Sequence, residues 1–155
     1  MRKTLYTLFA VLGLCLIAGC SDDNENNSPL AKQLAGEWHM ASWNGAAPVD
    51  FDAYMSFTSG GSFEIYQQLD EPGYQKYSGS YKLNDATLTG KYSDNSPLAG
   101  GFYEISFDEA GITLTLVSDP SVGEVSVYIR KAIPESIRNE AKVAKSSRSA
   151  YRLLF

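Results

Sequence analysis

The sequence predicts an all-β domain, an up-and-down, antiparallel, eight-stranded β-barrel with a short helical turn before it and a helix after it. From residue 34 onward, apolar residues recur with a period of two, and breakers interrupt the pattern roughly every ten residues. No connection is long enough for a helical crossover, so strands adjacent in sequence are expected to pair. The length of 155 residues, 44% hydrophobic and 20% charged, suits one globular domain.

Residues 1–19 have the features of a lipoprotein signal peptide. Arg2 and Lys3 precede an apolar run, residues 4–18, that is too short to span a bilayer comfortably. The run leads into Leu-Ile-Ala-Gly-Cys at 16–20, which resembles the lipobox of bacterial lipoproteins, whose cysteine thiol receives diacylglycerol. We therefore expect acylation, including palmitate, at Cys20, and two or three chains suffice for stable anchoring. The alternative is an ordinary signal peptide that happens to hold a cysteine.

Residues 20–28 are expected to form a lipidated, acidic tether, because residues 21–27 contain nothing able to enter a core. The acidic cluster after Cys20 resembles the export signal that sends lipoproteins of Bacteroides-group bacteria to the outer face of the outer membrane. We therefore expect a lipid-anchored outer-membrane protein at the cell surface. The alternative is a solvated linker with the domain facing the periplasm.

Charge and cysteine usage restrict the partners of the remaining domain, residues 29–155. The formal net charge is −5, and loss of the leader's Arg2 and Lys3 makes it −7. Such a chain gains nothing from counterion release on a phosphate backbone, so we expect no nucleic-acid partner. Cys15 lies in the leader, which leaves no second thiol for a disulfide with Cys20.

Eight strands are expected, each with one face to bury. Their ranges are 34–44, 51–58, 62–69, 75–83, 87–93, 102–107, 112–118 and 124–131. The clearest inward faces are Phe51, Ala53, Met55 and Phe57; Phe63, Ile65 and Leu69; Ile112, Leu114 and Leu116; and Val125, Val127 and Ile129. The eight strands can lie as an open sheet, fold as a sandwich or close, and only closure removes the two edges that invite aggregation.

Two helical segments are expected to flank the barrel. Ser28 and Pro29 suit the start of a short turn carrying Leu30 and Leu34. After the last strand, Pro134 opens a weakly amphipathic segment that runs to about Lys145. Its apolar side holds Ile137, Ala141 and Ala144, and its basic end holds Lys142. The apolar tail, residues 151–155, is expected to add to an edge or an end of the barrel.

The order of these features resembles the lipocalins, in particular the small lipocalin-like lipoproteins of Bacteroides-group bacteria. A helical turn leads into Gly36-Glu37-Trp38, seven further strands follow, and Arg130 stands at the end of the last one. The resemblance implies that Gly36 and Trp38 form the plug of the closed barrel end. It also implies that Arg130 packs over the Trp38 ring, a cation–π contact of about 0.5 to 2 kcal/mol. Strict alternation, however, places Arg130 on the face opposite Val127 and Ile129, and the Thr-Asp-Tyr motif of many lipocalins is absent.

The aromatic residues are the candidates for ligand contact. Six fall on the more apolar faces, where they fill the barrel or line a cup for a small amphipathic compound: Phe57, Phe63, Tyr77, Tyr81, Tyr92 and Phe107. Three fall on the other face, where they are expected to form an exposed patch for a partner protein: Tyr54, Tyr66 and Tyr128.

Polar residues indicate little chemistry. His39 is the only histidine and is expected to be structural, so no metal site and no cofactor are predicted. Asp50 and Asp52 lie on one side of a strand, as paired carboxylates of a glycosidase do, but are expected to be solvated charges. The favoured function is a lipid-anchored, non-catalytic barrel that binds a small amphipathic or hydrophobic ligand in its mouth. The alternatives are a closed platform serving as inhibitor or accessory subunit of a surface complex and, less favoured, an enzyme using Asp50, Asp52 and His39.

Overall fold

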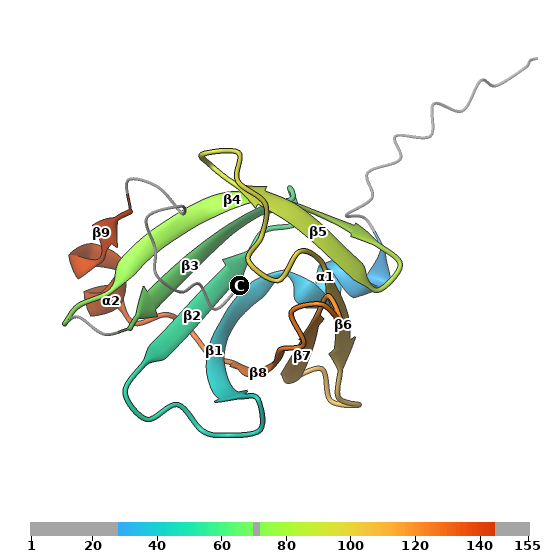
Figure 1. Cartoon of the computed structure of the whole chain (residues 1–155), viewed down its shortest axis with the longest axis horizontal. Helices are drawn as coiled ribbons and strands as arrows, with labels where there is room; N and C mark the ends of the chain where they lie inside the picture. Colours follow the sequence, from blue (N-terminus) through green and yellow to red (C-terminus); the bar gives the residue numbers. More distant parts are fainter. Residues whose placement is uncertain (1–27, 70–71, 145–155) are drawn as a thin grey trace, which may run out of the picture.

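Eight antiparallel strands and two short helices make up most of the fold (Figure 1). The structure is a computed structural model and describes residues 28–69 and 72–144; the leader, Cys20, the tether up to Asn27 and the tail at 151–155 lie outside these residues. The elements are α1 Pro29–Leu34, β1 Gly36–Trp43, β2 Asp52–Phe57, β3 Ser62–Gln68, β4 Gln75–Asn84, β5 Thr87–Tyr92, β6 Tyr103–Phe107, β7 Thr113–Ser118, β8 Val125–Arg130, α2 Glu135–Glu140 and β9 Lys142–Val143.

The strands close into a barrel, as predicted. Their order around the sheet is β3-β2-β1-β8-β7-β6-β5-β4, and β3 also pairs with β4, so the ring has no open edge between these eight. Each strand pairs antiparallel with its neighbours in the ring, and β8 pairs with β1. Within the ring the β5–β6 pairing is the shortest, with only two residue pairs, Thr87↔Glu104 and Leu88↔Tyr103. The predicted eight-stranded, up-and-down architecture is confirmed.

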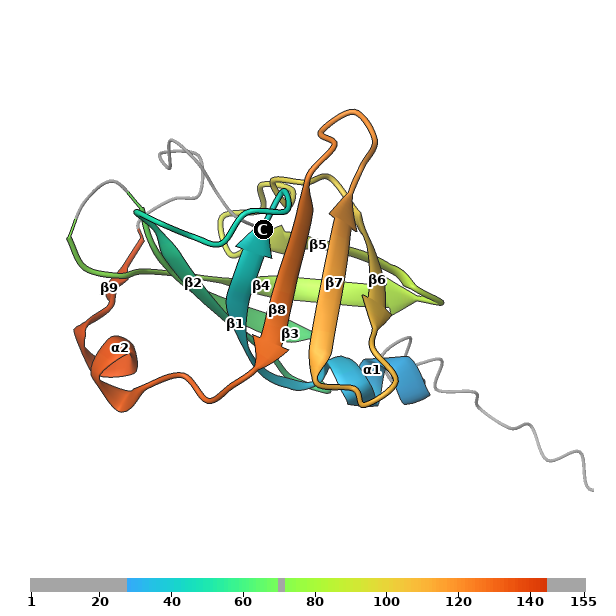
Figure 2. The same cartoon turned by 90° about the horizontal axis from the view of Figure 1, so that it is seen from below.

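The two ends of the barrel differ. At one end lie α1 and the turns that join β2 to β3, β4 to β5 and β6 to β7 (Figure 2). At the other end, the mouth, lie the longer connections, 44–51 between β1 and β2, 93–102 between β5 and β6, and 119–124 between β7 and β8. Leu98 of the second of these connections is 2% exposed and belongs to the core.

The face predicted for β8 is wrong. Ser126 and Tyr128 point inward and are buried, whereas Val125 and Ile129 are 38% and 41% exposed. Hydropathy favours the Val and Ile face, but Tyr128, whose side chain is larger than any single Val or Ile, is fully buried. The same phase places Arg130 on the inward side, paired with Trp38 in the β1–β8 register. Ile112, also expected inside, precedes β7 at the closed end and is 56% exposed.

The segment after β8 is only partly helical. α2 ends at Glu140, and Lys142–Val143 forms β9, which runs parallel to the start of β4. This corrects the longer predicted helix. The backbone N–H of Lys142 donates to the Tyr74 carbonyl and that of Ala144 to the Lys76 carbonyl. The segment lies against the outside of β2, β3 and β4 (Figure 1).

Candidate functional site

The closed end is organised around Trp38. Its indole is fully buried, its Nε1 donates a 2.9 Å hydrogen bond to the Leu34 carbonyl of α1, and its ring lies 5.7 Å from that of Phe107. The Arg130 guanidinium lies over the same ring at 4.2 Å from its centroid. The structure therefore brings together the residues that the lipocalin resemblance assigned to the barrel plug.

Arg130 ties three segments together at this end. Its guanidinium NH2 groups donate to the carbonyl of Gln33 in α1 and to that of Ala35, which follows α1. Its Nε donates to the Gly111 carbonyl in the turn before β7. Gly36 has φ +133°, and a Cβ there would lie 2.4 Å from the Arg130 guanidinium. The positive φ favours glycine at this position, and a larger residue would force the Arg130 guanidinium to move. At this end Trp38 is fully buried among α1, Phe107 and Arg130.

The barrel interior is aromatic and uncharged in its described part. Of the six ligand-lining candidates, five are at most 9% exposed and Phe107 is half-buried. They contact one another edge-on: Phe57 meets Tyr81 at 5.3 Å, and Tyr92 meets Phe63 at 5.8 Å and Tyr77 at 6.3 Å. The buried polar residues of the described chain are Gln67, Ser96, Ser118 and Ser126, none of which carries a charge.

Interior tyrosine hydroxyls bond to the protein's own backbone. The Tyr81 hydroxyl donates to the Thr58 carbonyl at 2.7 Å, and the Tyr103 hydroxyl accepts from the Gly100 N–H at 2.9 Å. Burial raises the pKa of Tyr92, Tyr103 and Tyr128, so all three stay protonated at neutral pH. These rings therefore present neutral surfaces, and the chain itself supplies hydrogen-bond partners for them.

A hollow of about 440 Å³ opens at the mouth rim, between the β1–β2 connection and the end of β3. Its apolar lining includes Val49, which is 85% exposed, together with the half-buried Phe51 and Leu69. Asp50 and Asp52 supply carboxylates to the same hollow. The rim thus combines apolar contact surface with negative charge.

The two aspartates of the rim are not equivalent. Asp50 precedes β2 and is exposed, whereas Asp52 accepts hydrogen bonds from His39 Nε2 at 2.8 Å and from the Tyr74 hydroxyl at 2.5 Å. His39 also stacks on Tyr54, with ring centroids 4.2 Å apart. Burial and the hydrogen bond to Asp52 raise the pKa of Tyr74, which makes its phenol a weaker nucleophile or base at neutral pH.

The aromatic patch predicted on the outer face is wrong. Tyr128 lies inside the barrel and is fully buried. Tyr54 and Tyr66 do point outward, but they are 5% and 2% exposed because the segment after β8 covers them. A partner protein cannot reach these rings without displacing that segment.

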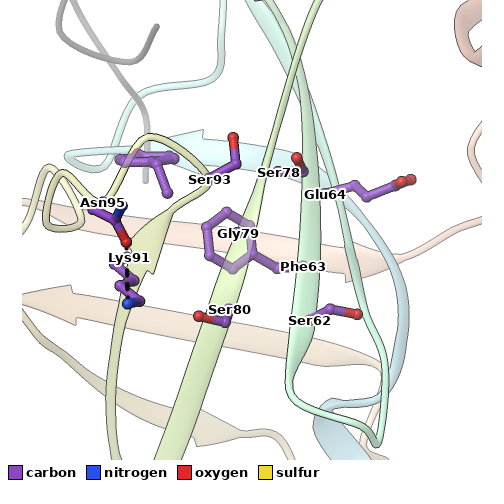
Figure 3. A pocket seen from close by; sticks show the side chains of 10 residues that line it. Ser62, Phe63, Glu64, Ser78, Gly79, Ser80, Lys91, Ser93 and Asn95 are labelled. Carbon is purple, nitrogen blue, oxygen red and sulfur yellow. Dashed lines mark hydrogen bonds between the residues drawn. The ribbon is translucent and has the colours of Figure 1, made fainter.

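A second hollow, of about 450 Å³, lies on the outer surface of β3, β4 and β5 (Figure 3). Gly79 lies in its centre, where a Cβ would come within 2.5 Å of the Phe63 ring. Short hydroxyl side chains line it, with Glu64 on one side and, on the other, Lys91 bonded to Asn95 at 3.2 Å. Its aromatic residues, Phe63 and Tyr92, are buried and offer no exposed ring to a ligand.

The rim residues Val49, Phe51 and Leu69 were not predicted as ligand contacts. The available signal was their position: apolar side chains beside Pro48 and Pro72, where strands end and connections begin. Within residues 28–69 and 72–144 no cluster of three His, Cys, Asp or Glu residues is arranged to hold a metal ion. In the same residues no helix has the length and apolar character needed to cross a membrane.

Comparison with known proteins gives similarities of structure only. No protein-family model matches the chain, and no curated protein does. A lipocalin-like protein from Bacteroides uniformis aligns with a TM-score of 0.49 at 22% identity, over 64% of this chain and 99% of that one. The lipoprotein YedD from Klebsiella pneumoniae aligns with 0.46 at 13% identity, over 68% and 79%. An uncharacterized protein from Bacteroides eggerthii aligns with 0.46 at 15% identity, over 63% and 99%. The chain is a closed, eight-stranded barrel by its own strand pairing, and its fold resembles that of the lipocalin-like protein from Bacteroides uniformis.

Proposed function

We propose that this protein is a lipid-anchored, non-catalytic barrel of the outer membrane that binds a small amphipathic compound at its mouth rim. The hollow of about 440 Å³ beside Val49, Phe51 and Leu69 carries the binding part of the proposal. Its size falls in the range of small-molecule sites, and its lining combines apolar side chains with the polar side chains of Asp50, Asp52 and Gln68. The anchor part rests on Cys20 and the sequence before it.

The charge at the rim narrows the ligand class. Asp50 is exposed and both aspartates line the hollow, so an anionic headgroup is repelled there. An apolar group packs against Phe51 and Leu69 and a neutral or cationic group lies toward Asp50. The described rings beyond the rim are buried and contact one another edge-on, which supports a ligand that sits in the rim.

Trp43 is a built-in reporter for this site. Its ring meets that of Phe51 edge-on at 5.7 Å, whereas the other tryptophan, Trp38, is fully buried at the closed end. We expect dodecyltrimethylammonium, below its micelle concentration, to change Trp43 fluorescence saturably, and dodecyl sulfate to bind more weakly. Val49→Ser should weaken binding of the cationic probe, whereas Ile112→Ser, at the closed end, should leave that binding unchanged. Equal binding of both probes to all three proteins contradicts the rim site.

The anchor is tested in the native host. Metabolic labelling with an alkyne analogue of palmitate should mark the protein, and Cys20→Ala should remove the label and release the protein from the membrane fraction. Protease added to intact cells then distinguishes the cell surface from the periplasmic face. A labelled Cys20→Ala protein contradicts acylation at this cysteine.

A second candidate function is a closed platform acting in a surface protein complex. The observation that favours it is the interior, where buried rings pack on one another and tyrosine hydroxyls bond to the backbone. Pull-down of the tagged protein from native membranes should then recover a partner in stoichiometric amount. Repeated recovery of none, together with saturable rim binding, favours the ligand-binding proposal.

A further inference from the structure

One outer wall of the barrel is apolar and exposed, with no cover among the residues that the structure describes. The side chains that point outward from β7 and β8 are Thr113, Thr115 and Val117, which pair in register with Ile129, Val127 and Val125. We call these six residues, with Ile112 at their closed-end edge, the bare wall. Seven large hydrophobic residues are exposed in the described part of the chain, and four of them, Ile112, Val117, Val125 and Ile129, belong to the bare wall.

The bare wall also differs from the other walls in charge. Residues 112–118 and 125–129 contain no Asp, Glu, Lys or Arg. The outer faces of β2, β3, β4 and β5 carry Asp52, Glu64, Lys82 and Lys91. A chain with a net charge of −5 thus keeps one strand pair free of charge on the side that faces outward, where solubility alone favours charged residues.

The chain before the fold enters it at one end of this wall. Ser28 caps α1, and α1 lies against the turn before β7, where a Cβ on Gly111 would meet the Gln33 side chain at 2.6 Å. Seven residues separate Ser28 from Cys20. Such a segment reaches about 29 Å at most, and a six-residue strand such as β7 is about 20 Å long. An anchor at Cys20 therefore lets the whole wall lie flat on a bilayer.

We infer that the bare wall lies on the lipid surface to which Cys20 anchors the protein, so that the membrane itself is its partner. This inference rests on the proposed acylation of Cys20. A negatively charged domain gains nothing from anionic lipid, so the contact is apolar and favours zwitterionic headgroups. The tether supplies a high local concentration, so a small apolar surface is enough.

A second copy of the chain fits the wall less well. Stable protein interfaces bury about 800 Å² per partner. The bare wall offers far less, because its exposed aliphatic side chains are only Ile112, Val117, Val125 and Ile129, and none of these is more than 56% exposed. The anchored domain, in contrast, has already lost translational entropy through its anchor, so contact with the bilayer costs only the entropy of fixing its orientation.

The test attaches the chain from Cys20 onward to phosphatidylcholine vesicles through the Cys20 thiol and a maleimide lipid. Thr115→Trp places a reporter on the bare wall, and Thr89→Trp places one on the exposed outer face of β5. Amphipathic helices that lie on a bilayer bury their apolar face about 5–10 Å into the headgroup boundary. A side chain on the bare wall at a similar depth would lie within reach of bromines on the acyl chains. Because of this depth, we expect brominated lipid to quench the fluorescence of Thr115→Trp at least about twofold more than that of Thr89→Trp.

Polar variants separate contact from folding. Val125→Thr with Ile129→Thr keeps the β-branched shape and should abolish the difference in quenching while the circular dichroism spectrum stays unchanged. Equal quenching at positions 115 and 89 in the unmodified background overturns the inference. So does a concentration-dependent dimer in sedimentation that the same double substitution dissociates. Because the anchor is attached chemically, these results do not depend on acylation in the host, which the labelling experiment measures separately.

Discussion

Two outer walls of the barrel, β2 with β3 and β7 with β8, differ in whether the chain covers their outward side chains. On β2 and β3 the outward residues Tyr54 and Tyr66 lie under Ile133, Ile137 and Ala141, which come from the segment after β8. On β7 and β8 the outward Val and Ile side chains have no such cover among the described residues. The covering segment buries these outward aromatic residues in a second, smaller hydrophobic core. The contribution of an outward side chain to stability therefore depends on whether another segment of the chain packs over it.

Polar contacts strengthen the covered wall. Lys76 and Arg138 lie over the Tyr66 ring at 5.4 and 6.0 Å from its centroid, and the Tyr66 hydroxyl donates to Glu64 at 2.8 Å. Glu64 in turn pairs with Lys76 at 2.7 Å. The bare wall has only short alcohols and aliphatic groups in equivalent positions. The covered wall should therefore respond strongly to substitution and the bare wall weakly.

Tyr66→Ala should have the largest effect. The ring is 2% exposed, and removal of a large buried aromatic side chain costs about 3 to 5 kcal/mol. Urea unfolding followed by circular dichroism measures the change. Tyr66→Phe, which keeps the ring and loses only the hydroxyl, is the matched control and should cost about 1 kcal/mol. A loss below 1 kcal/mol for Tyr66→Ala would mean that the second core does not stabilise the fold.

The sequence predicts the strands better than what covers them. Alternation over five to ten residues places all eight strands, because one face of each is buried. It fails on β8, where both faces contain apolar residues: Val125, Val127 and Ile129 outside, Tyr128 inside. Which residues of β8 face inward depends on the size of the Tyr128 side chain and on the contact between Arg130 and Trp38. Both depend on contacts distant in sequence.

The segment after β8 was predicted incompletely for a similar reason. The spacing of Ile137, Ala141 and Ala144 fits a helix, but alanine binds a helix to a surface only weakly. β5 pairs with β4 only from Gly79 onward, which leaves Gln75 and Lys76 open on that side, and β9 pairs with them. A free stretch of strand edge is visible only once the barrel is closed. The rim hollow was missed because it forms between two connections far apart in sequence.

Glu37→Ala should have the next largest effect, because Glu37 holds the start of the cover to β1. Its carboxylate accepts a 2.7 Å hydrogen bond from the Ile133 N–H and pairs with Arg138. We expect a loss of about 1 kcal/mol after allowance for its partial exposure. Hydrogen exchange should quicken in residues 133–144 and stay unchanged in β7 and β8. Glu37→Gln, which keeps an acceptor for Ile133, should show a smaller loss, and uniform quickening across the barrel contradicts this assignment.

Acid should weaken the covered wall selectively, by a smaller amount. Burial alone raises the pKa of Glu64, but hydrogen bonds from Lys76 and Tyr66 outweigh it and hold the pKa below its usual value of 4.5. A carboxyl with a lowered pKa in the folded state stabilises the fold above its unfolded pKa, and this contribution is lost as the pH falls. The urea midpoint should therefore drop more below about pH 4.5 in the wild type than in Glu64→Gln. Parallel curves for the two proteins contradict a stabilising ion pair.

Ile129→Thr, on the bare wall, should have the smallest effect on stability of the substitutions described. The side chain is 41% exposed on the bare wall, and threonine keeps its branching at Cβ, so we expect the free energy of unfolding to change by at most about 0.5 kcal/mol. The same change should reduce contact with phosphatidylcholine vesicles. An effect on vesicle contact without an effect on folding means that the aliphatic residues of this wall serve the surface against which they lie. A loss above about 1 kcal/mol in urea unfolding would instead mean that these side chains stabilise the fold itself.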